Sequence, residues 1–193
     1  MHPDYRQPNF YHFNEDSITL VKEALKLNLD AESILDLCAG CGVIGVEYAL
    51  GAPKCNKVSF LELQAEFIQY IQENSKLLMN QKIEIFQSSI SDFSESKKFD
   101  LILCNPPYFF SSSARESEDL QRGICRMFKV DTPQVLLDKA NRLLKAEGVL
   151  VLCFPTESAQ WRNAIEESRL SFELLCEKGK ISFLKLIKGD VNK

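Results

Sequence analysis

The sequence predicts an α/β domain built on a doubly wound, mostly parallel sheet. Short apolar runs typical of buried strands alternate along the chain with segments whose apolar residues recur at helical spacing. Of the 193 residues, 45% are hydrophobic and 26% are charged, a globular composition that excludes disordered, collagen-like and coiled-coil classes. Strands that alternate with helices form parallel sheets with helices on both faces.

The first half of the chain contains three predicted helices and four predicted strands. The first helix begins at Asp16 or Ser17, with Ile18 and Val21 on one face. The second ends at Gly51, where glycine and proline follow one another closely. The predicted strands are 33–38, 57–61, 82–87 and 99–104, and the second and third helices are 44–51 and 65–79.

The second half contains two further helices and three strands. Thr132 and Pro133 are a good N-cap and first-turn residue, and Gly148 is expected to end that helix. A helix over 158–168 and strands over 149–154, 172–176 and 181–187 follow. The last two strands are joined too tightly for a helical crossover, so they should be antiparallel. We expect a seven-stranded sheet, mostly parallel with an antiparallel C-terminal hairpin, in one domain over 1–193 with 1–30 as a helical lead-in.

Charge and cysteine content restrict the compartment and the partners. With 27 acidic and 23 basic residues the formal net charge is −4, so a nucleic-acid substrate would be met by a local basic patch. The seven cysteines are an odd number, and several lie within apolar runs, where free thiols behave as small buried hydrophobes. The N-terminus lacks the layout of a secretory signal, and no apolar run approaches the roughly 18–20 residues of a membrane span. We expect a cytoplasmic monomer with no membrane segment.

A glycine-rich turn joins the first predicted strand to the second predicted helix. Residues 36–45 read DLCAGCGVIG, a G-x-G-x-x-G in which the backbone can approach a ligand closely and the helix N-terminus stays open. Glu62 closes the next strand, where an acid can accept both hydroxyls of a ribose. A dinucleotide such as NAD and the nucleoside half of S-adenosylmethionine both fit. Asp36 favours the second, because it can hydrogen-bond the amino-acid end of S-adenosylmethionine but would repel a pyrophosphate.

Cys38 and Cys41 span the same turn and raise a metal or redox alternative. No second cysteine pair or histidine cluster completes such a site, and His2 and His12 are the only histidines. We therefore expect no metal.

The stretch FDLILCNPPY over 99–108 is the most informative in the chain. A buried strand ends there in Asn105, Pro106, Pro107 and Tyr108, at the sheet edge where ligands bind in open α/β folds. The prolines fix φ and remove two backbone donors, so Asn105 and the Pro106 carbonyl can accept both N–H groups of a planar amine. This localises the nitrogen lone pair for attack on a sulfonium methyl, and Tyr108 offers a ring for stacking. The alternative interpretation is a rigid loop after a strand.

In their order, these motifs resemble those of class I S-adenosylmethionine-dependent methyltransferases of the N6-adenine type, which have a Rossmann-like fold. Within that group the chain is most similar to the bacterial tRNA(Val) N6-adenine methyltransferases, which modify the adenine beside the anticodon. The similar segments include YHFNEDSITL over 11–20, NPPYF over 105–109 and the loop that follows. The resemblance implies S-adenosylmethionine as cofactor, a structured RNA such as tRNA as substrate, and methyl transfer to adenine N6.

The resemblance also implies a role for each candidate site residue. The catalytic residues are Asn105, Pro106, Pro107 and Tyr108, and the cofactor-binding residues are Asp36, Cys38, Gly40, Gly42, Glu62, Leu63, Ser89, Ile90 and Asn105. Two places depart from the family. The third strand usually ends in an acid that holds the cofactor's adenine amine, where this chain has Ser89, with Asp92 three residues on. Met127 and Phe128 stand where the family tends to have His and Glu.

Several alternatives stay open. The same tetrapeptide occurs in methyltransferases of guanine N2 in ribosomal RNA and of the glutamine amide in release factors. The glutamine type usually has an N-terminal helical domain, and DNA adenine methyltransferases add a recognition segment, for which 193 residues leave no room. A nucleotide-binding Rossmann module, either an NAD enzyme or a non-catalytic subunit, is the alternative of a different class.

Basic and aromatic residues give modest support for an RNA substrate. The basic residues, interleaved with acids, are Arg115, Arg122, Arg126, Lys129, Lys178, Lys180, Lys185 and Lys188. A group of aromatic residues could stack on bases, but we expect most of them to pack against the core. They are Tyr5, Phe10, Tyr11, Phe13, Phe109 and Phe110.

Overall fold

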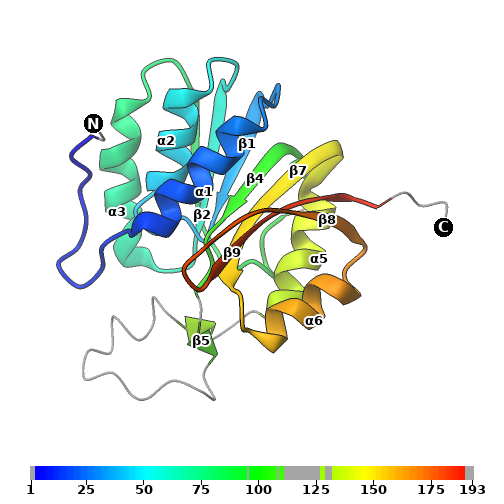
Figure 1. The fold of residues 1–193 in the computed structure, drawn as a ribbon. Helices are drawn as coiled ribbons and strands as arrows, with labels where there is room; N and C mark the ends of the chain where they lie inside the picture. The colour runs from blue at the N-terminus through cyan, green and yellow to red at the C-terminus, as the bar shows by residue number, and fades with distance from the viewer. Residues whose placement is uncertain (1–2, 95, 108, 111–126, 129–131, 190–193) are drawn as a thin grey trace.

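The sheet has seven strands in the spatial order β3-β2-β1-β4-β7-β9-β8 (Figure 1). The computed structural model describes residues 3–94, 96–107, 109–110, 127–128 and 132–189. The strands of this sheet are β1 (Ser33–Leu37), β2 (Lys57–Glu62), β3 (Lys82–Gln87), β4 (Phe99–Cys104), β7 (Leu144–Pro155), β8 (Leu170–Lys178) and β9 (Ile181–Lys188). Neighbours from β3 to β7 are parallel, and β9 is antiparallel to both β7 and β8. The predicted sheet and its C-terminal hairpin are confirmed.

Helices cover both faces of this sheet (Figure 1). On one face lie α1 (Glu15–Lys26), α2 (Val43–Gly51) and α3 (Ala65–Asn74), which continues as the 3-10 helix η1 (Ser75–Leu77). On the other face lie α5 (Pro133–Leu143) and α6 (Ala159–Glu167). Each face has its own hydrophobic core. In β1, Ile34 joins the first core and its neighbour Leu35 the second, as expected of a central strand buried on both sides.

A short pair of parallel strands, β5 (Phe109–Phe110) and β6 (Met127–Phe128), lies outside the main sheet. Met127 and Phe128, which stand where the family has His and Glu, thus belong to β6. Among the helices that the structure describes, none is long and apolar enough to cross a membrane.

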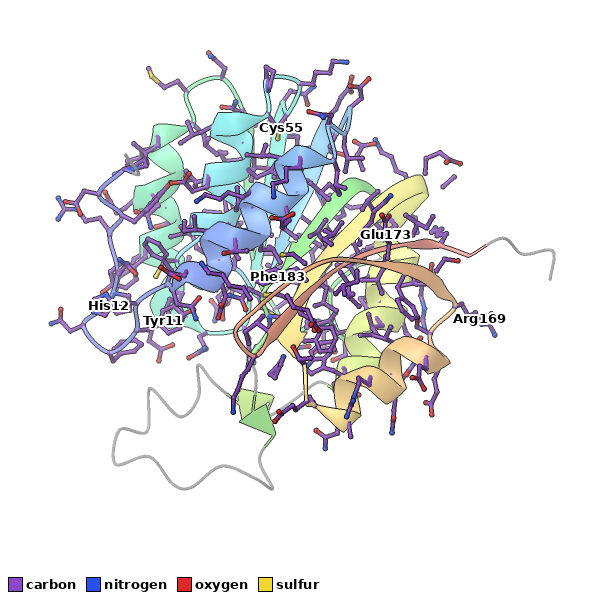
Figure 2. All side chains as sticks on the ribbon, in the orientation of Figure 1. Tyr11, His12, Cys55, Arg169, Glu173 and Phe183 are labelled. Carbon is purple, nitrogen blue, oxygen red and sulfur yellow. The ribbon has the colours of Figure 1, made fainter. Side chains whose placement is uncertain are left out.

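The aromatic residues of the N-terminal segment pack against the first core, as expected. The Tyr5 ring meets Phe13 edge-on at 5.8 Å between centroids, and Phe10 and Tyr11 both meet Phe67 of α3 edge-on at 6.0 and 5.4 Å. Figure 2 shows Tyr11 and His12 in this segment, on the side of the sheet that carries α1 to α3. The segment is thereby fixed to the domain before α1 begins.

The first helix, α1, begins one residue before the earlier of the two expected starts. Asn14 is the cap, and its Oδ1 accepts the N–H groups of Asp16 at 3.1 Å and Ser17 at 3.4 Å. The helix therefore begins at Glu15 instead of Asp16 or Ser17, because the asparagine side chain satisfies the free N–H groups of the first turn.

The helix expected over 132–148 is shorter than predicted, and this prediction was wrong at its C-terminal end. Thr132 caps α5 as expected, with its Oγ1 accepting the Val135 N–H at 3.3 Å, but the helix ends at Leu143 and β7 begins at once. Gly148 lies inside β7, next to a register shift between Phe99 and Leu101 of β4. A Cβ at Gly148 would lie 2.9 Å from the Phe99 carbonyl oxygen, so the glycine permits close approach of two strands instead of ending a helix.

The helix expected over 65–79 also ends early, at Asn74. The Asn74 side chain accepts the Arg6 N–H at 2.8 Å and donates to the carbonyl oxygens of Arg6 at 3.0 Å and Cys41 at 2.9 Å. This buried amide links the N-terminal segment, the glycine turn and the end of α3. The change from α-helix to the 3-10 helix η1 at this point was not visible in the apolar spacing.

We predict that Gly148→Ala lowers the free energy of unfolding by about 1–3 kcal/mol, because the added methyl group meets backbone atoms that cannot move without disturbing the strand pairing. Chemical denaturation monitored by circular dichroism measures this change. Glu147→Ala, an exposed neighbour in the same strand, is the control and should change stability by less than about 0.5 kcal/mol. An equal effect of the two substitutions would contradict the packing argument.

Candidate active site

The glycine turn between β1 and α2 has a left-handed backbone at three positions. Cys38, Gly40 and Gly42 have φ values of 62°, 53° and 77°. Glycine adopts this conformation without a steric penalty, and Gly42 donates its N–H to the Ala39 carbonyl at 2.8 Å as the N-cap of α2. The turn therefore presents backbone instead of side chains at the start of the helix, which suits a ligand that lies close to the chain.

Asp36 lies beneath this turn and is completely buried. Its Oδ2 accepts the Gly45 N–H at 2.8 Å, while Oδ1 has no hydrogen-bond partner among the described residues. Burial raises the pKa of the Asp36 carboxyl to about 8, and the charge of Glu62 adds to the shift. One oxygen of a buried acid is thus left for a group that the described part of the chain does not supply.

Glu62 holds the turn from the neighbouring strand. Its Oε2 accepts the Gly40 N–H at 2.8 Å and its Oε1 accepts the Gln64 N–H at 2.9 Å. Burial raises the pKa of the Glu62 carboxyl, and these N–H groups partly offset the rise. Leu63, the next residue, is exposed and lies at the edge of the sheet beside this carboxylate. Each carboxylate oxygen keeps a second lone pair with which it can accept a hydrogen bond from a hydroxyl group.

Ser89 follows β3 and forms a closed turn with Asp92. The Ser89 hydroxyl donates to Asp92 Oδ2 at 2.7 Å and accepts the Asp92 N–H at 3.1 Å. Ser89 and Ile90 are both buried, and Ile90 packs in the second core. The turn brings the Asp92 carboxylate next to the position where the family usually has an acid.

Asn105 stands at the carboxyl end of β4, directly after a residue that pairs with β1. Cys104 is in register with Leu37, so the Asn105 loop and the glycine turn leave adjacent strands at the same sheet edge. The Asn105 Nδ2 donates to the Ser17 Oγ of α1 at 3.1 Å. Pro106 is buried and Pro107 half-buried, whereas Tyr108 lies outside the described residues.

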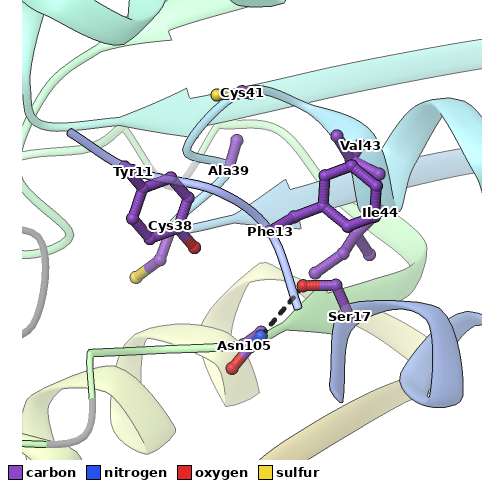
Figure 3. A pocket seen from close by; sticks show the side chains of 9 residues that line it. All are labelled: Tyr11, Phe13, Ser17, Cys38, Ala39, Cys41, Val43, Ile44 and Asn105. Atoms are coloured by element: carbon purple, nitrogen blue, oxygen red, sulfur yellow. Dashed lines mark hydrogen bonds between the residues drawn. The ribbon is translucent and has the colours of Figure 1, made fainter. Parts of the chain in front are cut away.

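A pocket opens between these elements (Figure 3). It is lined by Tyr11, Phe13, Ser17, Cys38, Ala39, Cys41, Val43, Ile44 and Asn105. Of the predicted site residues, Cys38 and Asn105 line it directly. Asp36 and Glu62 support the turn that forms one of its walls. Ser89, Ile90 and Leu63 follow the ends of β3 and β2 at the same edge of the sheet.

From the sequence we considered Tyr11 and Phe13 as base-stacking residues but expected them to pack against the core, and we assigned no site role to Ser17. Tyr11 lies over the turn, since a Cβ placed on Gly40 would be 3.7 Å from its ring. For Ser17, the sequence signal was its place in the segment 11–20, which resembles the family but carries no catalytic residue type. The contribution of all three residues depends on how α1 folds back onto the sheet.

The cysteines near the turn form no metal site among the described residues, where no group of three or more His, Cys, Asp or Glu could hold an ion. The six described cysteines are free thiols. Burial raises the pKa of the Cys104 thiol well above its usual range, and a hydrogen bond with Cys38 adds to this. Both thiols thus contribute to packing beside the pocket.

The hairpin lysines divide into two groups. Lys178, near the tip of the hairpin, pairs with Glu15 of α1 at 2.9 Å. At the other end, Lys185 pairs with Glu173 at 3.1 Å and Lys188 donates to the Leu144 carbonyl at 2.8 Å. The loop that carries Arg115, Arg122, Arg126 and Lys129 lies outside the described residues.

The family of this chain follows from its similarity to known proteins. Residues 13–185 match the family described as the methyltransferase small domain. The chain belongs to this family. Its fold is also that of known methyltransferases: a 16S rRNA N2 G1207 methyltransferase of T. thermophilus, solved in complex with AdoMet and guanosine, superimposes with a TM-score of 0.68 at 19% identity, over 92% of this chain and 44% of that one.

Curated relatives are named as tRNA modification enzymes. The tRNA1(Val) (adenine(37)-N6)-methyltransferase of Actinobacillus pleuropneumoniae serotype 7 is 29% identical over 181 residues, which cover 87% of this chain and 74% of the relative. The enzyme of the same name from Photorhabdus laumondii is 33% identical over 129 residues, which cover 65% and 52%. The chain is thus a methyltransferase of the small-domain family with the Rossmann-like fold expected for S-adenosylmethionine dependence, and that expectation is confirmed.

The residues present fit S-adenosylmethionine. The unpartnered Oδ1 of Asp36 and the open backbone of the turn suit a ligand with a cationic amino group. A pyrophosphate would bring further negative charge next to two buried acids, Asp36 of β1 and Glu62 of β2, whose pKa values burial already raises. The electrostatics of the site therefore disfavour a dinucleotide.

The raised pKa of Asp36 predicts a pH-dependent stability. Between about pH 4 and 8 the folded protein keeps a proton on Asp36 that the unfolded chain, with its ordinary value of 3.8, has lost. The wild type therefore loses stability as pH rises through this range, and the loss is complete above the folded pKa. We predict that Asp36→Asn, which cannot ionise, removes this slope.

Urea denaturation of the ligand-free protein at pH 5, 7 and 9 measures the difference between Asp36→Asn and wild type, which should grow in favour of the variant as pH rises. Any constant offset from the new amide is independent of pH and does not enter the comparison. Asp138→Asn, at an exposed position of α5, is the control. Parallel curves for Asp36→Asn and wild type would contradict the assignment.

Proposed function

We propose that this methyltransferase transfers the methyl group of S-adenosylmethionine to the exocyclic N6 amine of adenine in a structured RNA, specifically a tRNA. The observation that carries the proposal is the Asn105 side chain, held by Ser17 at the end of β4, one strand from the glycine turn. The names of the curated relatives support the tRNA and the adenine N6 as target.

We assign the cofactor-binding roles by the place of each residue. Gly40, Gly42 and Cys38 would lie against the methionine end, with Asp36 beneath them. Glu62 would accept the ribose hydroxyls, and Leu63 would cover the nucleoside. The backbone of Ser89 and Ile90 would face the adenine of the cofactor. The Asp92 carboxylate would accept a hydrogen bond from the adenine amine, the role that the acid at the end of the third strand usually has in the family. The Ser89–Asp92 hydrogen bond supports this last role.

The target amine would be bound by acceptors alone. The Asn105 Oδ1 and the Pro106 carbonyl oxygen can accept its two N–H groups, and neither Pro106 nor Pro107 has an N–H that would compete. Acceptance of both hydrogens localises the nitrogen lone pair and orients it for in-line attack. S-adenosylmethionine, when bound, supplies a methyl group on a sulfonium, which needs no metal to leave. The proton of the methylated nitrogen passes to water, and Tyr108 would stack on the base.

The same proposal extends to the organisation of the chain. Residues 1–193 act as one methyltransferase domain with 1–30 as its lead-in, the protein is a monomer, and its compartment is the cytoplasm, where tRNA is modified. The contacts of Tyr5, Phe10 and Tyr11 with the domain support the assignment of the lead-in to the catalytic unit.

Incubation of bulk RNA with the protein and isotope-labelled S-adenosylmethionine, followed by nucleoside mass spectrometry, tests the proposed reaction. The RNA should come from a strain that lacks this enzyme. We expect labelled N6-methyladenosine in the tRNA fraction. Labelled N2-methylguanosine would move the substrate to the guanine alternative, and the absence of label from RNA would favour a protein amide or a non-catalytic module.

We predict that Asn105→Ala lowers the rate of methyl transfer at least a hundredfold, because an electrostatic contact to the reacting nitrogen is lost. Binding of S-adenosylhomocysteine, measured by calorimetry, should change little. Asn80→Ala, in an exposed loop far from the pocket, is the matched control and should behave as wild type. Full activity of the Asn105 variant would refute the role of this residue.

A further inference from the structure

We infer that Ser17 is a positioning residue, which sets the orientation of the Asn105 side-chain amide for acceptance of the target amine. The inference deepens the proposed function and rests on it. Its basis is the hydrogen bond between Asn105 Nδ2 and Ser17 Oγ, at 3.1 Å, which joins residues 88 positions apart in the sequence (Figure 3).

The two ends of an asparagine amide have opposite chemistry. Nδ2 can only donate hydrogen bonds and Oδ1 can only accept them, so a rotation of the amide by half a turn would present the target amine with a donor. The target amine needs an acceptor. Because Nδ2 is engaged by Ser17, Oδ1 is turned away from α1, as Figure 3 shows.

The backbone already restrains the rest of Asn105. Cys104 is paired with Leu37 in the sheet, and Pro106 and Pro107 have fixed φ values after it. The remaining freedom of Asn105 lies in its two side-chain torsions. The hydrogen bond from Nδ2 to the Ser17 Oγ restrains these torsions.

Ser17 is well placed to provide such a contact. It is 3% exposed and its N–H donates to the N-cap Asn14, so the hydroxyl belongs to a fixed first turn of α1. Leu20, Val21 and Ala24, which continue the buried face of the helix, hold it on the sheet. The helix therefore carries the hydroxyl to the end of β4 with little freedom.

The burial of a hydroxyl on this apolar face itself calls for an explanation. The other buried residues of α1 are Leu20, Val21 and Ala24, and a buried hydroxyl without a partner would cost stability. The Ser17 Oγ accepts a hydrogen bond from Asn105 Nδ2. The hydrogen bond to Asn105 in the loop after β4 therefore accounts for a polar residue on this otherwise apolar face of α1.

Steady-state kinetics of Ser17→Ala test the inference. We expect kcat for methyl transfer to RNA to fall about tenfold, the size of one lost hydrogen bond, with KM for S-adenosylmethionine unchanged. Ser17→Thr keeps the hydroxyl and should restore most of kcat. Ser75→Ala is the matched control: Ser75 is also buried, and its Oγ donates at 3.2 Å to the Gln72 carbonyl, far along the chain from the loop. It should leave kcat unchanged.

A second measurement reports on the amide directly and does not require the threonine variant to fold. In ¹⁵N-resolved NMR spectra, the side-chain NH₂ signals of Asn105, assigned by their loss in Asn105→Ala, should shift in Ser17→Ala and stay in place in Ser75→Ala. Wild-type kcat in Ser17→Ala, or unshifted Asn105 signals, would overturn the positioning role. If Asn105→Ala itself keeps full activity, the proposed function fails first, so the two failures are distinguishable.

Discussion

The parallel pairing of β1 with β4 is the constraint on which the site depends. It places Leu37 beside Cys104, so the glycine turn and the Asn105 loop begin at the same height on neighbouring strands. The chain order reverses at this point of the sheet, since β2 and β3 lie on one side of β1 and β4 on the other. Connections on the two sides of such a switch point diverge and leave a crevice at the carboxyl ends of the strands. A methyl donor and a methyl acceptor need to meet in such a crevice from two directions.

Two buried acids, Asp36 and Glu62, support the crevice, although burying an acid costs folding free energy. Asp36 and Glu62 are both almost free of solvent, and burial raises the pKa of each. Backbone N–H groups of Gly45, Gly40 and Gln64 compensate them only in part. A turn stabilised by apolar contacts alone would not need these carboxylates. Their presence is accounted for under the proposed function, in which the charge and hydroxyl groups of the cofactor would complete the hydrogen bonds that the described residues leave open.

The sequence predicted the elements that have a local cause. Short apolar runs marked the strands. The residues of the glycine turn and of the Asn105 loop were found because their types are unusual after a strand. The end of α5 at Leu143 was missed, because the role of Gly148 is decided by the approach of Phe99 from another strand. The contact of Ser17 with Asn105 was missed for the same reason. Its partners are 88 positions apart, and nothing in either neighbourhood specifies the other.

A turn after β3 joins Ser89, which stands where the resembled family usually has an acid, to the side chain of Asp92. A serine hydroxyl alone is a weak acceptor for an adenine amine, but here it donates its proton to Asp92 and accepts the Asp92 N–H. These two hydrogen bonds hold the Asp92 carboxyl group next to Ser89. Asp92 lies three residues after Ser89, so the local turn supplies a carboxyl group near the end of β3 from a different residue. This placement is what the proposed contact with the adenine amine requires.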